Sequence, residues 1–170
     1  MRRLLMMVMI VLSFTLTGCS GQKSTVLPDS YALGYFNSIE YLYNSNPSFP
    51  GTNEYLAFDF SNLEFDDLEQ LITLVQDFCK EKGYTYLEGT IDELVQWGYI
   101  EVYVFESGST FPNGFPDGVL FQFSPVSIEE DTLVTQISMW KGSLSSWGSI
   151  YTATYNEGVW SVRADGIIMS

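Results

Sequence analysis

The sequence contains no histidine and only two cysteines, Cys19 and Cys79, in its 170 residues. Without histidine the chain has no Ser-His-Asp or Cys-His catalytic site and no histidine-ligated metal centre. It also has no Cys-x-x-Cys pair, no Gly-x-Ser-x-Gly motif and no Walker phosphate-binding loop. These absences exclude the commonest nucleophilic, redox and nucleotide-dependent enzymes, and we expect no cofactor.

Basic residues are scarce, with seven Lys and Arg against 21 Asp and Glu, for a formal net charge of −14. A surface of this sign repels nucleic-acid phosphates and anionic lipid headgroups, so we expect no nucleic-acid partner. The many carboxylates do not form a calcium loop. Asn113 and Asp117 flank glycines but lack the alternating Asp/Asn spacing of such loops, so we expect no specific metal site.

The longest apolar run lies near the N-terminus. Arg2 and Arg3 precede an apolar run over residues 4–16 that only Ser13 and Thr15 interrupt. A membrane-spanning helix needs about 20 apolar residues, so this run is too short to span and has the length of a signal-peptide core. Residues 1–18 are therefore predicted to be an export signal.

The end of this run, Leu16-Thr17-Gly18-Cys19, resembles the lipobox of bacterial lipoprotein signal peptides. The resemblance implies cleavage after Gly18 and a diacylglycerol on Cys19. Two acyl chains anchor a protein stably, whereas one binds a membrane only marginally. We therefore expect a lipoprotein on the extracytoplasmic face of the cell membrane or outer membrane, with the membrane as a partner through Cys19. The alternative is an ordinary secretory signal followed by a chance cysteine.

Residues 19–30 are predicted to form a polar tether, and residues 31–170 a single domain. Loss of Arg2 and Arg3 would leave five basic against 21 acidic residues, a formal charge of −16. The periodicity predicts helices over residues 66–82 and 90–97, the second opened by a Thr90–Glu93 capping box. Residues 31–50 are compatible with a short helix or an extended arm.

The strand pattern is densest in the C-terminal half. Turn residues fill 107–118, a small-residue connection covers 141–148, and residues 156–158 suggest a three-residue hairpin loop. Strands are expected at residues 54–60, 84–88, 100–105, 119–123, 133–140, 150–155, 159–163 and 167–169. Together these elements predict an α+β fold, with one or two helices packed on one face of an antiparallel β-meander.

Residues 54–170 resemble the C-terminal domains of small, uncharacterised bacterial lipoproteins and secreted proteins. The likeness rests on a Tyr-x-small-x-aromatic strand at Tyr151–Tyr155, followed by Gly-x-Trp-x-Val at residues 158–162. These are hairpin and core positions, so the resemblance implies a fold and no catalytic residues.

Two kinds of residue are candidates for function. Trp147, Tyr151 and Tyr155 would stack on sugar rings or clasp a peptide if they were exposed, and would be core residues if they were buried. Cys79 falls on the apolar stripe of its predicted helix, which indicates a buried structural thiol. We therefore expect a non-enzymatic binding or scaffolding module whose partner is an unidentified envelope protein or glycan.

The alternative function is an envelope hydrolase that uses paired carboxylates. Three acidic clusters are available, at residues 66–67, 92–93 and 129–131. A glycosidase needs two such groups facing one another across a cleft, about 5 to 9 Å apart. However, helix starts and turns attract acidic residues for structural reasons, and all three clusters lie at such places.

Overall fold

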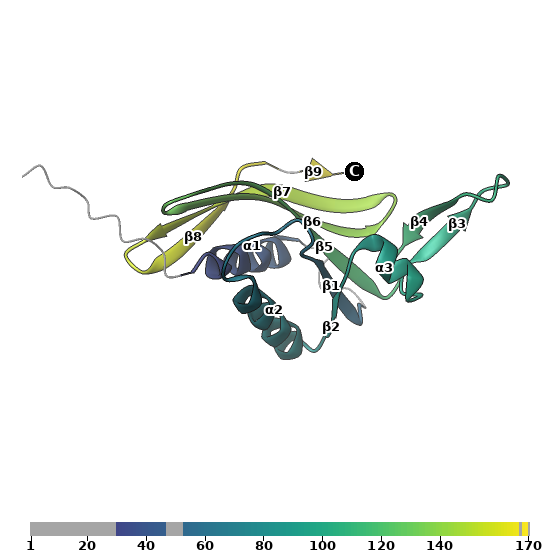
Figure 1. Ribbon diagram of the computed structural model, residues 1–170, viewed down its shortest axis with the longest axis horizontal. Coiled ribbons are helices and arrows are strands. Elements are labelled where there is room, and N and C mark those ends of the chain that lie inside the picture. Colours follow the sequence, from purple (N-terminus) through teal and green to yellow (C-terminus); the bar gives the residue numbers. More distant parts are fainter. Residues whose placement is uncertain (1–29, 47–52, 167, 170) are drawn as a thin grey trace, which may run out of the picture.

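The computed structural model describes residues 30–46, 53–166, 168 and 169. Within this part, three helices accompany one nine-stranded sheet (Figure 1). The helices are α1 (Ala32–Ser45), α2 (Leu68–Lys82) and α3 (Ile91–Gln96). The strands are β1 (Tyr55–Asp59), β2 (Thr85–Glu88), β3 (Glu101–Val104), β4 (Thr110–Gly114), β5 (Gly118–Glu129), β6 (Thr132–Gly142), β7 (Ser145–Asn156), β8 (Val159–Ala164) and β9 (Ile168–Met169).

The sheet is mixed, so the α+β class is confirmed while the simple antiparallel meander is wrong. β1 pairs in parallel with both β2 and β5. β5, β6, β7 and β8 then follow one another as antiparallel neighbours, as expected. The β1–β2 pair is parallel because α2 carries the chain back to the starting end of β1 before β2 begins, which is a crossover rather than a hairpin. The chain returns to the same end through α3, β3 and β4 before β5 begins, so β5 also runs parallel to β1.

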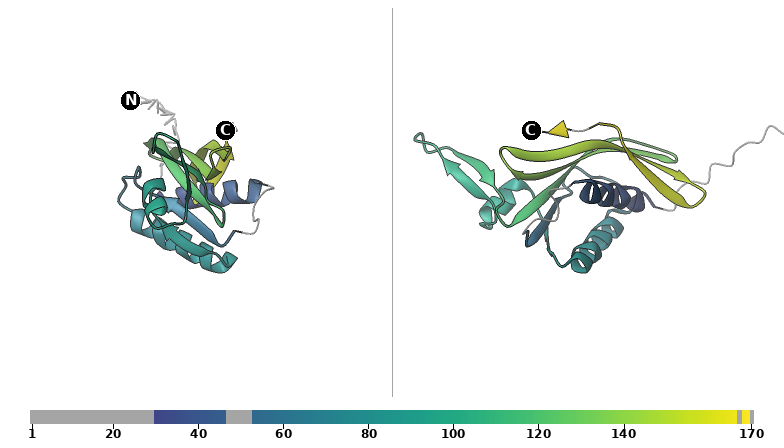
Figure 2. Two further views of the ribbon diagram at one scale, coloured as in Figure 1. Left: turned by 90° about the vertical axis from the view of Figure 1, so that its right-hand side faces the viewer. Right: turned by 180° about the vertical axis from the view of Figure 1, so that it is seen from behind.

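The helices cover both faces of the sheet, which corrects the prediction that they share one face. α1 and α2 pack on the concave side of the long strands, whereas α3 lies beside β1 and β5 on the other side (Figures 1 and 2). β1 is consequently buried on both faces. Leu56 and Phe58 enter the main core, and Ala57 enters the smaller cluster under α3.

The main core is rich in aromatic rings that stack across the sheet. Phe58 has no exposed surface, and its ring lies 4.9 Å from Phe121, 5.8 Å from Phe60 and 5.7 Å from Tyr86, centroid to centroid. These four rings come from three neighbouring strands and from the residue after β1. They join the parallel part of the sheet to the core that α2 completes.

The helix ends follow the sequence signals. α2 ends at Gly83, whose φ of 81° allows the amides of Gly83 and Tyr84 to cap the Lys80 and Cys79 carbonyl groups. The capping box of α3 is present, with Thr90 and Glu93 bonded reciprocally. The sequence left open whether residues 31–50 form a short helix or an extended arm. Residues 32–45 form helix α1.

Three connections are shorter than expected because the strands extend into them. β4 occupies residues 110–114 inside the segment expected to be all turn, and β6 and β7 leave only residues 143–144 between them. The last hairpin has a two-residue loop, Glu157 and Gly158, both with positive φ. Ile168 and Met169 pair with β7, while residue 167 lies outside the described residues.

Candidate functional site

A two-stranded hairpin leaves the body of the molecule at one end, and we call its residues 101–114 the β3–β4 arm (Figures 1 and 2). Its turn is a tight one. The Gly108 amide donates to the Phe105 carbonyl, and the Phe105 amide donates to the Ser109 carbonyl, both at 2.9 Å. Gly108 has a φ of 82°, as the left-handed position of a three-residue hairpin loop requires.

The base of the arm is fixed to the body on both strands. Ile100 and Phe115, which flank the arm, are buried in the cluster under α3. The Phe115 amide donates to the Lys141 carbonyl at 2.9 Å, and the Ser143 amide donates to the Asn113 carbonyl at 3.0 Å. β4 pairs with β6 only at Gly114, at the base of the arm, so residues 101–113 extend away from the rest of the sheet.

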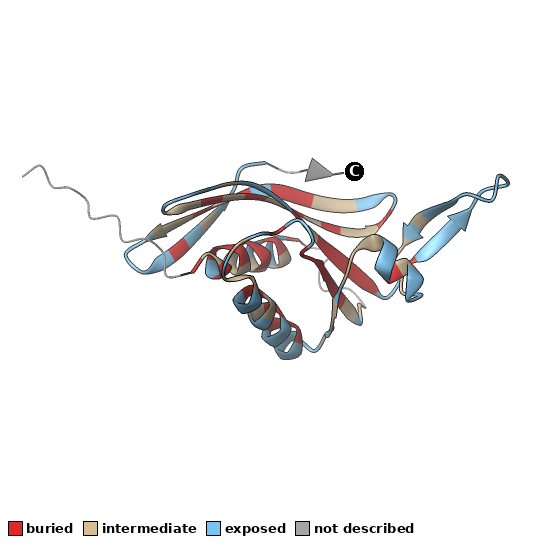
Figure 3. Ribbon diagram, in the orientation of Figure 1, coloured by how far each residue is buried: buried red, intermediate tan, exposed pale blue. Residues whose placement is uncertain are grey.

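The arm exposes apolar side chains on both of its faces (Figure 3). Tyr103 is 56% exposed, Val104 60% and Phe111 51%, and Val102 and Phe105 are also exposed. The Tyr103 and Phe105 rings meet edge to face at 4.9 Å. Large apolar side chains gathered on an exposed element mark interaction sites, because a protein that keeps them in water loses the stabilisation that burial would bring.

The three aromatic residues singled out from the sequence lie elsewhere and do not form an exposed surface. All three occupy the face of β7 that meets the main core. Tyr151 is 2% exposed, while Trp147 and Tyr155 are partly buried against the same core. Tyr155 also packs on Trp160, with ring centroids 5.4 Å apart. Tyr151 is therefore a core residue, which is the second of the two possibilities that the sequence left open, because α1 packs on this face of β7.

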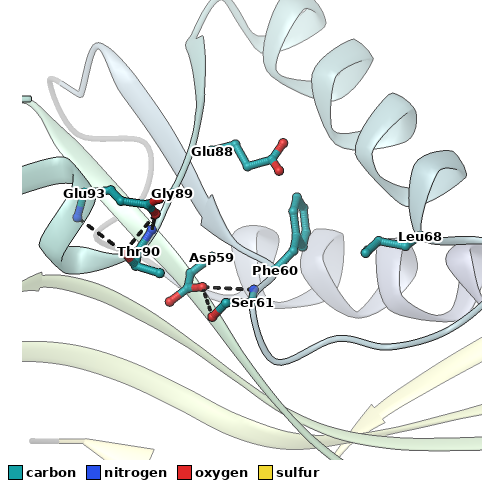
Figure 4. A pocket seen from close by; sticks show the side chains of 8 residues that line it. All are labelled: Asp59, Phe60, Ser61, Leu68, Glu88, Gly89, Thr90 and Glu93. Carbon is teal, nitrogen blue, oxygen red and sulfur yellow. Dashed lines mark hydrogen bonds between the residues drawn. The ribbon is translucent and has the colours of Figure 1, made fainter.

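A second feature is a pocket of about 240 Å³ at the carboxyl ends of β1 and β2 (Figure 4). Three carboxylates line it, from Asp59, Glu88 and Glu93, and Phe60 and Leu68 add apolar walls. The carboxyl ends of parallel strands are a common position for binding sites in sheets with helical crossovers. This pocket is the place where the hydrolase alternative would have to act.

Each of these carboxylates has a structural hydrogen bond. The Asp59 Oδ1 accepts from the amide and the hydroxyl of Ser61 at 3.1 and 2.6 Å, and Glu88 accepts from the Tyr86 hydroxyl at 2.6 Å. Glu93 accepts from the amide and hydroxyl of Thr90, and these bonds lower the pKa of the Glu93 carboxyl. Glu93 is therefore ionised at neutral pH and is a poor proton donor for glycoside hydrolysis.

The three acidic clusters named from the sequence remain apart. Residues 66–67 precede α2, residues 92–93 lie in the first turn of α3, and residues 129–131 comprise the end of β5 and the two-residue β5–β6 turn. Only Glu93 among them reaches the pocket. Within the described ranges, no group of three Asp, Glu, Cys or His side chains is arranged to hold a metal ion.

Cys79 is buried in the main core, as its position on the helical stripe predicted. Burial raises the pKa of its thiol to about 12, and it raises the pKa of Tyr35 and of Tyr151 to about 12 as well. The three groups therefore stay protonated in the folded protein at pH values where they ionise in an unfolded chain.

This difference predicts a loss of stability at alkaline pH. Below about pH 9 both states are protonated at these groups, so their contribution to the free energy of unfolding is constant. From pH 9–10 to about 12 the unfolded chain loses these protons first, and stability falls. Urea midpoints measured from pH 8 to 12 test this; a midpoint that rises over the interval would contradict the burial of these groups.

The predicted export signal, Cys19 and the tether up to residue 29 lie outside the described residues. In the part of the chain that is described, no helix has the length and apolar character needed to cross a membrane. The lipid anchor therefore stays a prediction from the sequence.

Comparison with known proteins gives no relative. No protein-family model matches the chain, and neither the search of curated proteins nor that of solved structures returns a significant match. The function must be inferred from the geometry of the chain itself.

The sequence contains a partial signal for the arm. Val102-Tyr103-Val104-Phe105 is apolar at every position, and Glu101 and Glu106 bound it. A buried strand would show the same run, which is why periodicity alone does not separate a core strand from an exposed one. The glycine-containing loop and the apolar residues after it are typical of a hairpin partner strand.

Proposed function

We propose that this chain is a lipid-anchored binding module on the extracytoplasmic face of a bacterial envelope, and that it docks a protein partner through the β3–β4 arm without catalysing a reaction. The observation that carries the proposal is the exposure of five large apolar side chains on one protruding hairpin. Eight further large apolar side chains are exposed elsewhere in the described residues, including Leu144 and Val159, but they are spread over several elements, whereas the arm gathers five within fourteen residues.

The positions of anchor and arm support this function. Ser30, the first described residue, accepts a hydrogen bond from the Trp160 indole through its carbonyl oxygen, and Tyr31 donates to the Glu130 carbonyl at the β5–β6 turn. The arm joins β6 at Gly142, the other end of this strand. An 11-residue strand spans roughly 35 Å. Ser30, where the predicted tether meets the domain, and the base of the arm therefore lie at opposite ends of β6.

The chemistry of the arm favours a protein over a lipid surface as the partner. Residues 101–118 contain three acidic residues and no lysine or arginine. Anionic headgroups would repel such a segment, whereas membrane-binding elements carry basic residues beside their apolar ones. A protein groove accepts aromatic and aliphatic side chains and excludes water around them.

Site-specific crosslinking in intact cells tests the proposal. Benzoylphenylalanine at position 111 of the full chain should give, on irradiation, a discrete protein adduct in the membrane fraction. The matched control is the same probe at Val159, which is 65% exposed and begins β8, near the start of β6 rather than at the Gly142 end where the arm joins. We expect no adduct at position 159, because among the described residues of β8 and its loop only Val159 is a large exposed apolar side chain.

Two results would contradict the proposal. One is the absence of any adduct at position 111 when the same protein is expressed and folded. The other is equal adduct formation at positions 111 and 159, which would reflect random encounters in the envelope. An adduct at position 111 that disappears in a Tyr103→Ser variant would support docking through the arm, because Tyr103 and Phe111 face one another across the hairpin.

A hydrolase using paired carboxylates remains the second candidate, because three carboxylates line one pocket. Its proton donor would have to be Asp59 or Glu88, since hydrogen bonds from Thr90 lower the pKa of Glu93 and favour its ionised form. Release of soluble fragments from peptidoglycan by the wild-type protein, abolished in Asp59→Asn, would favour this candidate over the binding module. The binding module predicts no release by either protein.

A further inference from the structure

β3 is the last strand of its sheet. The strand order ends β6–β4–β3, and among the described residues β3 pairs with no strand except β4. Val102, Tyr103, Val104 and Phe105 thus form a hydrophobic edge without a neighbour. Native proteins usually protect such edges with lysine, proline or a covering loop, because an open edge pairs readily with another extended chain.

The register identifies which backbone groups face outward. The Phe105 amide donates to Ser109, so Phe105 points its backbone groups toward β4. Orientation alternates along an antiparallel strand, so Tyr103 also faces β4, whereas Val102 and Val104 direct their N–H and C=O groups to the open side. Pro112, which has no N–H, lies opposite Val102 and fits this pattern.

The two edges of the hairpin differ in a way that selects β3. β4 carries Pro112 in the position that would donate from its outer edge, so that edge lacks a donor there. The outer edge of β3 contains no proline and no basic residue. The outer edge of β3 is therefore the edge of the hairpin that remains open to pairing with another strand.

The ends of this edge are acidic. Glu101 and Glu106 bound the four apolar residues, and both are exposed. They lie on a chain with five basic and 21 acidic residues once the predicted signal is removed. A second copy of the chain would bring a similar excess of negative charge, which disfavours self-pairing, whereas a segment with basic ends would gain attraction at both.

We infer that β3 receives an extended segment of a partner protein by β-strand addition, and that this segment carries about four apolar or β-branched residues between two lysines or arginines. The inference rests on the proposed function and specifies its binding mode. Main-chain hydrogen bonds to Val102 and Val104 supply affinity, and the acidic ends supply selectivity.

Short peptides test this chemistry. The probe is a fluorescent Lys-Val-Thr-Val-Thr-Lys peptide, titrated against the full chain in nanodiscs of zwitterionic lipid. Glu-Val-Thr-Val-Thr-Glu has the same strand propensity and the opposite end charges, and should bind at least about tenfold more weakly. The lysine peptide with alternate backbone nitrogens methylated keeps its side chains and charges, and should lose binding because one edge of its backbone is blocked.

Two proline variants isolate the edge of the arm. Val104→Pro removes an outward N–H from β3, and Thr110→Pro makes the same change on the outer edge of β4, directly opposite in the register. Neither amide bonds to the other strand in this register, so both hairpins should form. We expect Val104→Pro to weaken the lysine peptide at least about tenfold and Thr110→Pro to leave it unchanged.

The outcomes separate this inference from the proposed function. If Val104→Pro keeps both peptide binding and the position-111 crosslink, edge pairing is wrong while docking through the arm stands. If the position-111 crosslink never forms, the proposed function fails. Equal binding of the lysine and glutamate peptides would contradict the inference that the partner segment has basic ends. If the protein forms dimers and Val104→Pro dissociates them, the edge of β3 pairs with a second copy of the chain instead.

Discussion

Replacing Phe58 by alanine is expected to lower the free energy of unfolding by about 3–5 kcal/mol, the range for deleting a fully buried aromatic side chain. Phe58 has no exposed surface and stacks with Phe60, Tyr86 and Phe121. Its loss leaves a cavity where the parallel strands meet the main core. Whole domains are stable by only about 5–15 kcal/mol, so this one change removes a large share.

Thermal unfolding measures this effect against a matched control. For a chain of this length we expect the melting temperature to fall by roughly 6–20 °C in Phe58→Ala. Phe105→Ala removes the same ring from the exposed arm and should change the free energy of unfolding by less than about 1 kcal/mol. Equal losses in the two variants would mean that the arm packs against the body, contrary to its exposure.

The second large effect is expected from Cys19→Ser. If the Leu16–Cys19 sequence is a lipobox, the substitution removes the atom that carries the diacylglycerol, and the protein should leave the membrane fraction or accumulate as an uncleaved precursor. Two acyl chains bind a bilayer far more tightly than one, so the change in distribution should be nearly complete.

Fractionation and metabolic labelling with fatty acid measure this change, and Ser20→Ala serves as the control beside the same cleavage site. The control should stay in the membrane fraction and take up label. Cys19→Ser protein that still fractionates with membranes and still takes up labelled fatty acid would contradict the anchor.

Much of the fold could be predicted because its signals are local. The apolar stripe and Gly83 mark α2, and the Thr90–Glu93 capping box marks α3. The alternation in residues 133–139 matches the buried face of β6, where Leu133, Thr135, Ile137 and Met139 point inward. In each case the element is specified by residues close together in the sequence. It can therefore be predicted without knowing which distant parts of the chain pack against it.

The parallel pairing of β1 and the position of α3 could not be predicted in the same way. A strand buried on both faces shows no alternation of apolar and polar residues. Its sequence therefore does not indicate which strands pair with it or which helices cover it. β1 pairs with β5 across about sixty residues of intervening chain. That pairing depends on how the α2 crossover and α3 pack, which are long-range contacts.

The candidate site was missed for a related physical reason. Trp147, Tyr151 and Tyr155 looked suited to binding because they are aromatic and close in sequence, but Tyr151 is buried beneath α1, and Trp147 and Tyr155 are partly buried against the main core. The arm residues are equally apolar, yet none of the three described helices covers them. Whether an apolar side chain is exposed depends on the placement of other elements, and the sequence pattern does not contain that placement.

The most direct test of docking through the arm is the accessibility of a cysteine at position 103. Tyr103→Cys in the full chain should react quickly with a membrane-impermeant maleimide when purified, because Tyr103 is exposed, and the native Cys79 thiol should stay silent because it is buried with a pKa near 12. In membranes isolated from the source cells we predict protection at position 103 by about tenfold or more, with Val159→Cys reacting equally in both preparations. Equal reaction of position 103 in purified protein and in membranes would contradict a partner on the arm.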